Sequence, residues 1–157
     1  MSKFISVLSA IITLSFFEVS AVNAMGNQDS KPAVTTRDAF EGGKSAVYSG
    51  RFEEAIRLLT KVVNIEPKNA DAHNYLGYSY RKIGKLELAA SSYQLVFAIN
   101  PDHKGALEYQ GELFLKQGNL SAAKENFSRL EKLCPSGCKE RAELGRAIAD
   151  FNAVRGN

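Results

Sequence analysis

The strongest constraint on the fold is that glycine, alanine and proline recur along the sequence at a spacing of 34 residues. A fixed period of this length is the signature of an architecture built from stacked copies of one unit. Three such units are predicted between residues 36 and 135. The recurring positions are Gly43, Gly77 and Gly111; Gly50, Gly84 and Gly118; Ala55, Ala89 and Ala123; and Pro67, Pro101 and Pro135.

Apolar residues between these positions follow the period of an α-helix from Thr36 onward. The pattern predicts helix pairs at about 36–49 and 52–65, 70–83 and 86–99, and 104–117 and 120–133. The glycines at 50, 84 and 118 fall between the two helices of each pair, where a left-handed residue is needed. The fold class is therefore predicted to be all-α, with three helical hairpins.

The glycines at 43, 77 and 111 lie inside the first helix of each pair, where glycine costs about 1 kcal/mol relative to alanine. This cost predicts that the second helix of the same pair packs closely against them, with the alanines at 55, 89 and 123 facing the contact. Beyond Pro135, residues 139–154 predict a lone helix with Leu144, Ile148 and Phe151 on one face. Such a helix is typical of the cap that closes a repeat stack.

The middle unit carries His73-x2-Leu76-Gly77-x2-Tyr80, then Ala89-x3-Tyr93 and Pro101, and so resembles a tetratricopeptide repeat (TPR). The third unit follows the same pattern, whereas Ala39-x2-Gly42-Gly43-x2-Ala46 makes the first unit degenerate and the least stable. The resemblance implies a right-handed α-solenoid with units at 36–69, 70–103 and 104–137, and a capping helix within 138–157. It also implies an interaction scaffold.

Residues 1–24 predict a secretory signal peptide, because Lys3 precedes an uncharged run from Phe4 to Phe17 and Ala24 ends a small-residue cleavage site. An uncleaved anchor and a buried helix are the alternatives. The expected mature protein is exported, periplasmic in a bacterium, has no stable membrane span, and begins with a flexible segment at 25–35.

The only two cysteines, Cys134 and Cys138, lie four residues apart at the turn before the final helix. An oxidising exported context favours a structural disulfide. Free thiols and a redox or metal function remain the alternatives. The segment from Leu133 to Cys138 also resembles small exported proteobacterial TPR proteins with a C-terminal Cys-x3-Cys segment, which agrees with a periplasmic location.

Composition and motifs exclude several classes of function. The net charge of +3, from 20 Lys and Arg against 17 Asp and Glu, does not favour nucleic-acid binding. Gly43-Lys44-Ser45 is not a phosphate-binding loop, because Asp38 stands where that motif needs glycine. His73 is predicted to be packed and hydrogen-bonded, and neither it nor His103 has ligand spacing. We therefore expect no enzyme activity, cofactor or metal.

The positions that packing leaves free on the first helices predict a concave groove that binds a peptide or protein segment. In TPR proteins that hold the C-terminal carboxylate of a chaperone, Lys and Asn recur at set groove positions. Phe40 and Lys44 occupy the first pair of these positions here, so recognition of a chaperone tail is not expected. A solvated face without a ligand, self-association into a homo-oligomer, and a thiol-dependent accessory role remain alternatives. The predicted groove residues are Phe40, Lys44, Val47 and Tyr48; Asn74, Tyr78, Arg81 and Lys82; and Glu108, Glu112, Leu115 and Lys116.

Overall fold

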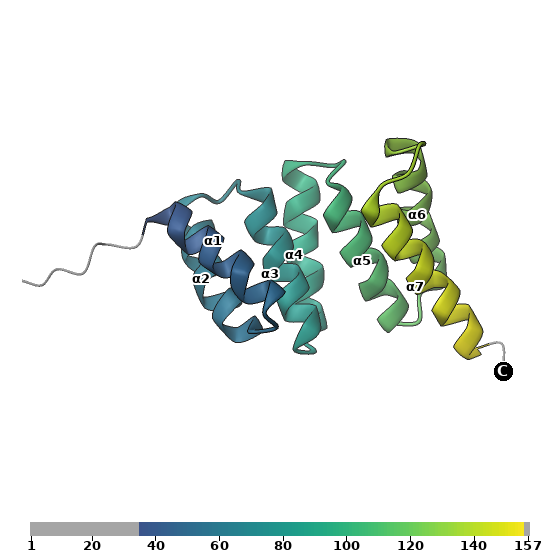
Figure 1. Ribbon diagram of the computed structural model, residues 1–157, viewed down its shortest axis with the longest axis horizontal. Helices are drawn as coiled ribbons and strands as arrows, with labels where there is room; N and C mark the ends of the chain where they lie inside the picture. Colours follow the sequence, from purple (N-terminus) through teal and green to yellow (C-terminus); the bar gives the residue numbers. More distant parts are fainter. Residues whose placement is uncertain (1–34, 156–157) are drawn as a thin grey trace, which may run out of the picture. The chain divides into compact units, whose positions relative to one another are not determined.

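The computed structural model describes residues 35–155, and this part of the chain contains helices and no strands (Figure 1). It confirms the predicted all-α fold class, and every predicted helix end lies within one residue of the observed one. The helices are α1 (Thr36–Tyr48), α2 (Phe52–Ile65), α3 (Ala70–Lys82), α4 (Leu86–Ile99), α5 (Lys104–Lys116), α6 (Leu120–Leu133) and α7 (Lys139–Arg155).

The predicted signal peptide at 1–24 and nearly all of the predicted flexible segment lie outside the described residues. Within residues 35–155, every helix is too short or too polar to cross a bilayer.

Side chains and glycines fix the ends of the helices. The Thr35 hydroxyl accepts a hydrogen bond from the Asp38 amide and the Asp38 carboxylate accepts one from the Thr35 amide, which forms a capping box at the start of α1. Asn69 caps α3 in a similar way, by accepting from the Ala72 amide. The turns inside the hairpins place Gly50, Gly84 and Gly118 at φ of 71°, 79° and 79°, a region that favours glycine.

The predicted close approach at the helical glycines is confirmed in the first two hairpins. A Cβ added to Gly43 would lie 2.7 Å from Leu59, and one added to Gly77 would lie 2.5 Å from the ring of Tyr93. Leu59 and Tyr93 are both fully buried. The second helix of each pair therefore packs directly on the backbone of the first, which a larger residue at either glycine would prevent.

The third hairpin departs from this prediction. A Cβ added to Gly111 would lie 2.6 Å from Leu144 of α7, and no atom of α6 is among its nearest neighbours. Phe127 of α6, which corresponds to Leu59 and Tyr93, instead lies 3.0 Å from the position of a Cβ at Gly145. The contact partner was predicted wrongly because α7 supplies a fully buried leucine at this point.

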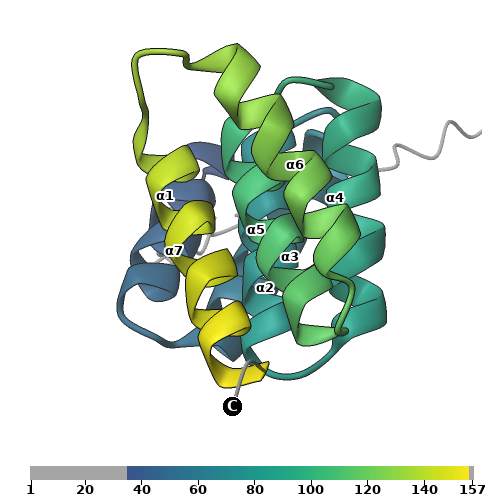
Figure 2. The ribbon, with the colours of Figure 1, turned by 90° about the vertical axis from the view of Figure 1, so that its right-hand side faces the viewer.

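Helix α7 packs against both α5 and α6, as the view from the C-terminal end shows (Figure 2). It closes the stack by burying Leu144 completely, together with partly buried Ala147, Ile148 and Phe151. Gly145 follows Gly111 by 34 residues. Helix α7 therefore takes the place of the first helix of a fourth unit, in addition to acting as a cap.

Substitution of Gly77 by alanine is predicted to lower the free energy of unfolding by about 1 to 3 kcal/mol, because the new methyl group overlaps the buried ring of Tyr93. Urea denaturation measures the change. Gly84→Ala is the control, because its Cβ meets no atom within 4 Å and only its φ of 79° opposes the change. A loss at Gly77 no larger than that at Gly84 would contradict this packing.

The sulfur atoms of Cys134 and Cys138 are 2.10 Å apart, which is disulfide distance, and the pair lies between the end of α6 and the start of α7. Replacement of both by serine is predicted to lower the free energy of unfolding by at most about 2 kcal/mol, because the closed loop is short. Thermal denaturation of the purified protein, with and without a reductant, checks this. An unchanged melting temperature in the double variant would refute a stabilising role.

Candidate functional site

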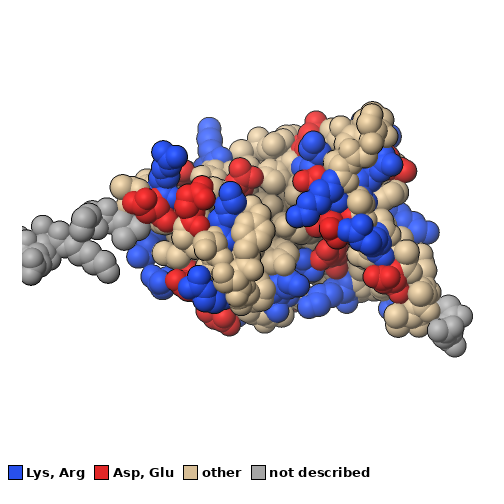
Figure 3. Space-filling model, viewed as in Figure 1, with Lys and Arg blue, Asp and Glu red and all other residues tan. Residues whose placement is uncertain are grey.

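The predicted groove residues lie along the first helices, but they do not form a free stripe. Tyr48, Lys82 and Lys116 are exposed, whereas Phe40, Lys44, Tyr78 and Glu112 are half-buried. The remaining five are buried: Val47, Asn74, Arg81, Glu108 and Leu115. One face of the molecule carries charges of both signs around a patch of uncharged residues (Figure 3).

The predicted groove aromatics Phe40, Tyr48 and Tyr78 pack on other aromatic rings instead of on one another. The ring of Tyr78 lies between Phe52, at a centroid distance of 6.0 Å, and Tyr109, at 4.7 Å. Tyr75 similarly lies 6.1 Å from Phe40 and 6.3 Å from Tyr48. The sequence analysis missed Tyr75 and Tyr109, although each directly follows a predicted groove residue.

A buried ion pair joins the second and third units. Arg81 Nη2 of α3 lies 2.5 Å from Glu112 Oε2 of α5. The guanidinium also lies over the rings of Tyr78 and Tyr109, at 5.2 and 5.9 Å from their centroids. Arg81 is only 5% exposed, so its charge depends on this single carboxylate and on the aromatic rings. The geometry assigns Arg81 first to fixing α3 against α5.

Glu108 is a buried carboxyl on α5 with charged residues of α7 nearby. It is 6% exposed, and no side chain among residues 35–155 forms an ion pair with it. Burial raises the pKa of Glu108 to about 8; the negative charges of Glu112, Glu140 and Glu143 add to this effect, and Lys139 opposes it. The fold therefore disfavours the charged form of this carboxyl and supplies no ion-pair partner for it within residues 35–155.

Asn74 places a second acceptor near the start of α5. Its side chain is 5% exposed, and its Oδ1 atom has no hydrogen-bond donor in the described part of the chain. Its Nδ2 atom lies 3.0 Å from the position that a Cβ would take at Gly105, one turn before Glu108. A larger residue at position 105 would displace this amide.

The C-terminal halves of α3, α5 and α7 surround a hollow of about 490 Å³. Its apolar lining comes from Leu115 of α5 and from Ala147, Phe151 and Val154 of α7. The sequence analysis did not place α7 in the groove, although the glycine period continues to Gly145. The charged rim consists of Arg81, Glu112, Lys116, Asp150 and Arg155.

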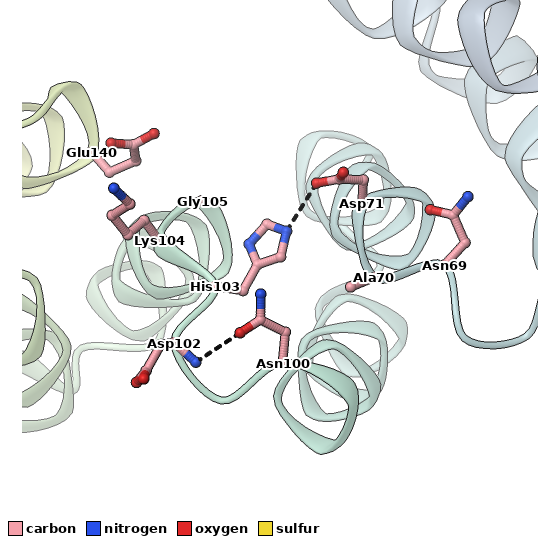
Figure 4. Close-up of a pocket in the computed structure, with 9 residues that line it drawn as sticks. All are labelled: Asn69, Ala70, Asp71, Asn100, Asp102, His103, Lys104, Gly105 and Glu140. Carbon is pink, nitrogen blue, oxygen red and sulfur yellow. Dashed lines mark hydrogen bonds and ion pairs between the residues drawn. The ribbon is translucent and has the colours of Figure 1, made fainter. Parts of the chain in front are cut away.

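A second hollow, of about 390 Å³, lies where α3 and α5 begin and is polar (Figure 4). His103 caps α5 by accepting the Ala106 amide at Nδ1, so its Nε2–H donates to Asp71 at 3.0 Å. The contact fixes α5 against α3. His73 is 7% exposed and bonds the Pro67 carbonyl at 3.0 Å, which confirms its predicted packed and hydrogen-bonded position.

Comparison with known proteins agrees with this geometry. A tetratricopeptide repeat family model matches residues 40–103. RNA polymerase II-associated protein 3 from Xenopus laevis is 27% identical over 129 residues, which are 81% of this chain but 20% of that protein. The chain thus spans about a fifth of the length of this curated relative.

Two solved structures show the same arrangement of helices. The first TPR of Spaghetti (RPAP3), bound to the HSP90 peptide SRMEEVD, has a TM-score of 0.65 at 25% identity, covering 75% of this chain and 93% of that one. The TPR2B domain of yeast Sti1, in a complex with pHsp70, has a TM-score of 0.68 at 12% identity, covering 76% and 97%. The described residues therefore form a TPR fold.

Replacement of Glu108 by glutamine is predicted to stabilise the protein at alkaline pH. The carboxyl has a pKa of about 8 in the folded protein against an ordinary value of 4.5. The folded state therefore holds the proton more tightly, and wild-type stability falls as the pH rises from about 4.5 to 8. Glutamine removes this loss, which is on the order of a few kcal/mol above pH 8.

Melting temperatures of the two proteins between pH 5 and 8.5 measure the effect. The difference is expected to be small at pH 5 and to increase with pH. Glu131→Gln, on the exposed surface of α6, is the matched control and is expected to show no such trend. A Glu108→Gln difference that is independent of pH would mean that the carboxyl is not buried in its charged form.

Proposed function

We propose that this protein is a non-enzymatic binding module that docks a peptide or protein segment against α3, α5 and α7. The observation that carries the proposal is the hollow of about 490 Å³ between these helices. It combines an apolar lining with a charged rim, which is the composition of a site that takes one apolar anchor and orients the segment around it.

The exposure of the lining residues supports docking. Val154 is 80% exposed at the edge of the hollow, and Lys116 is also exposed. Arg155 lies over the ring of Phe151, at 4.5 Å from its centroid. An apolar side chain of a partner would cover surface that now contacts water, and about 25 cal/mol for each Å² covered favours its binding.

The related structures support a peptide ligand, and the residues here point away from an acidic one. The TPR of Spaghetti is described as bound to an HSP90 peptide with two adjacent glutamates. In this chain, the third unit presents Glu108 and Glu112 in the groove, and Arg81 is already paired with Glu112. Arg81 therefore offers no free positive charge to an acidic tail, and the proposed partner differs from a chaperone terminus.

The proposed place of action is outside the cytoplasm, and in a bacterium the periplasm. The sequence of residues 1–24 supports export. The pair of cysteines at disulfide distance supports an oxidising compartment. The proposed module is thus an envelope scaffold or assembly factor.

Lys116→Glu combined with Val154→Asp is predicted to reduce partner capture at least about tenfold, because it changes both the rim charge and the apolar lining. Both residues are exposed, so helicity is expected to remain unchanged. The measurement is co-purification of partners with the tagged chain from exported fractions, in which the recovered protein is expected to lack residues 1–24.

The matched control is Lys124→Glu combined with Leu95→Asp, which makes the same kinds of change at exposed positions of α6 and α4. This variant is expected to capture partners as the wild type does. Equal capture by both double variants would place the binding surface elsewhere, and recovery of the uncleaved chain in the cytoplasm would refute export.

A further inference from the structure

Two buried polar groups on the groove side of the molecule have no role in the fold. The Glu108 carboxyl has no ion-pair partner and the Asn74 Oδ1 atom has no hydrogen-bond donor within residues 35–155. Both side chains are more than nine-tenths buried. Each group is an acceptor, and a buried acceptor without a donor lowers the stability of the folded protein. The fold bears this cost at Asn74 on α3, and the unpaired Glu108 carboxyl lies on the next first helix, α5.

The positive groups near Glu108 are committed elsewhere or remain at the surface. Arg81 pairs with Glu112. The amino group of Lys104 points toward Glu140 at the edge of the polar hollow (Figure 4). Lys139 is exposed and lowers the pKa of Glu108 less than burial, Glu112 and Glu140 raise it. No positively charged side chain of residues 35–155 therefore forms an ion pair with the Glu108 carboxyl.

We propose that Glu108 binds the basic side chain of a lysine or arginine in the docked segment, with Asn74 Oδ1 as an additional acceptor. An ammonium or guanidinium group supplies hydrogen-bond donors, which the Asn74 amide oxygen lacks. It also supplies a positive charge, which the ionised Glu108 carboxylate lacks. This inference rests on the proposed function, because it names the chemical class of the segment that the same groove takes.

The spacing of the site defines where the basic residue stands in the segment. Glu108 and Leu115 are seven residues apart on α5, which corresponds to about 10 Å along the helix axis. An extended chain advances about 3.3 Å per residue, so three residues cover this distance. The segment therefore carries a basic residue three positions from the apolar residue that enters the hollow at Leu115.

The charges at the two ends of the groove fix the direction of the segment. Glu140 lies in the first turn of α7, and it and Glu143 act on Glu108. Lys116 and Arg155 lie in the last turns of α5 and α7 and line the apolar hollow. The basic residue is attracted to the acidic end, and acidic residues of the segment are attracted to the other end.

Binding of a basic side chain is coupled to ionisation of Glu108. Because burial, Glu112, Glu140 and Glu143 raise its pKa to about 8 against the opposing effect of Lys139, the carboxyl of the free protein is mostly protonated below that pH. It must release its proton to pair with a cation. The affinity for the basic segment therefore increases by up to about tenfold per pH unit below pH 8 and then levels off.

The test uses immobilised octapeptides that hold one leucine and that carry lysine, arginine, norleucine or glutamate at each other position in turn. The wild-type protein is expected to prefer lysine or arginine about tenfold over norleucine at three positions from the leucine. Glu108→Gln is expected to abolish this preference and its pH dependence while it keeps the affinity for norleucine peptides. Glu131→Gln is the matched control and is expected to behave as the wild type does.

The outcomes separate the two proposals. Binding of norleucine peptides without any preference for basic residues overturns the inference and leaves the groove as a docking site. A preference for basic residues that survives in Glu108→Gln, or an affinity that does not change between pH 6 and 8, also overturns it. If the wild type binds no peptide of the set, the inference and the proposed peptide specificity fail together. Circular dichroism of each variant verifies that its helices are intact.

Discussion

The structure depends on a close approach between helices that only a missing side chain allows. At Gly43 and Gly77, the second helix of the hairpin places a fully buried leucine or tyrosine against the backbone of the first. This contact sets the distance within each hairpin and hence the stacking of successive hairpins. The position of each first helix along the groove depends on this contact. A binding surface on α3 and α5 is therefore positioned by packing on the opposite face of these two helices.

The last hairpin uses the same constraint with a different partner. Gly111 receives Leu144 of α7, while Phe127 packs on Gly145. This exchange brings α7 against α5, where it places charged residues near Glu108 and contributes Phe151 and Val154 to the hollow. The final helix thus closes the core and builds one wall of the candidate site. The cysteine pair lies in the short turn that precedes this helix.

Two kinds of buried charge meet in the groove, and they have different consequences. Arg81 and Glu112 neutralise each other across α3 and α5, which fixes the two units together. Glu108 has no such partner and its pKa is about 8. A group that lowers the stability of the free protein is a common feature of binding sites, because a ligand that satisfies it gains affinity in proportion.

The sequence alone determined the hairpins and their limits, because glycine, proline and the helical apolar period act within one or two turns of the chain. It also predicted a groove face, on which Arg81, Asn74 and Glu108 were expected to be free binding residues. Only the tertiary structure decided that these three are buried and that α7 lines the groove. The physical reason is that burial and ion pairing depend on which helices lie opposite, such as α5 opposite Arg81 and α7 opposite Glu108, and such contacts join residues far apart in sequence.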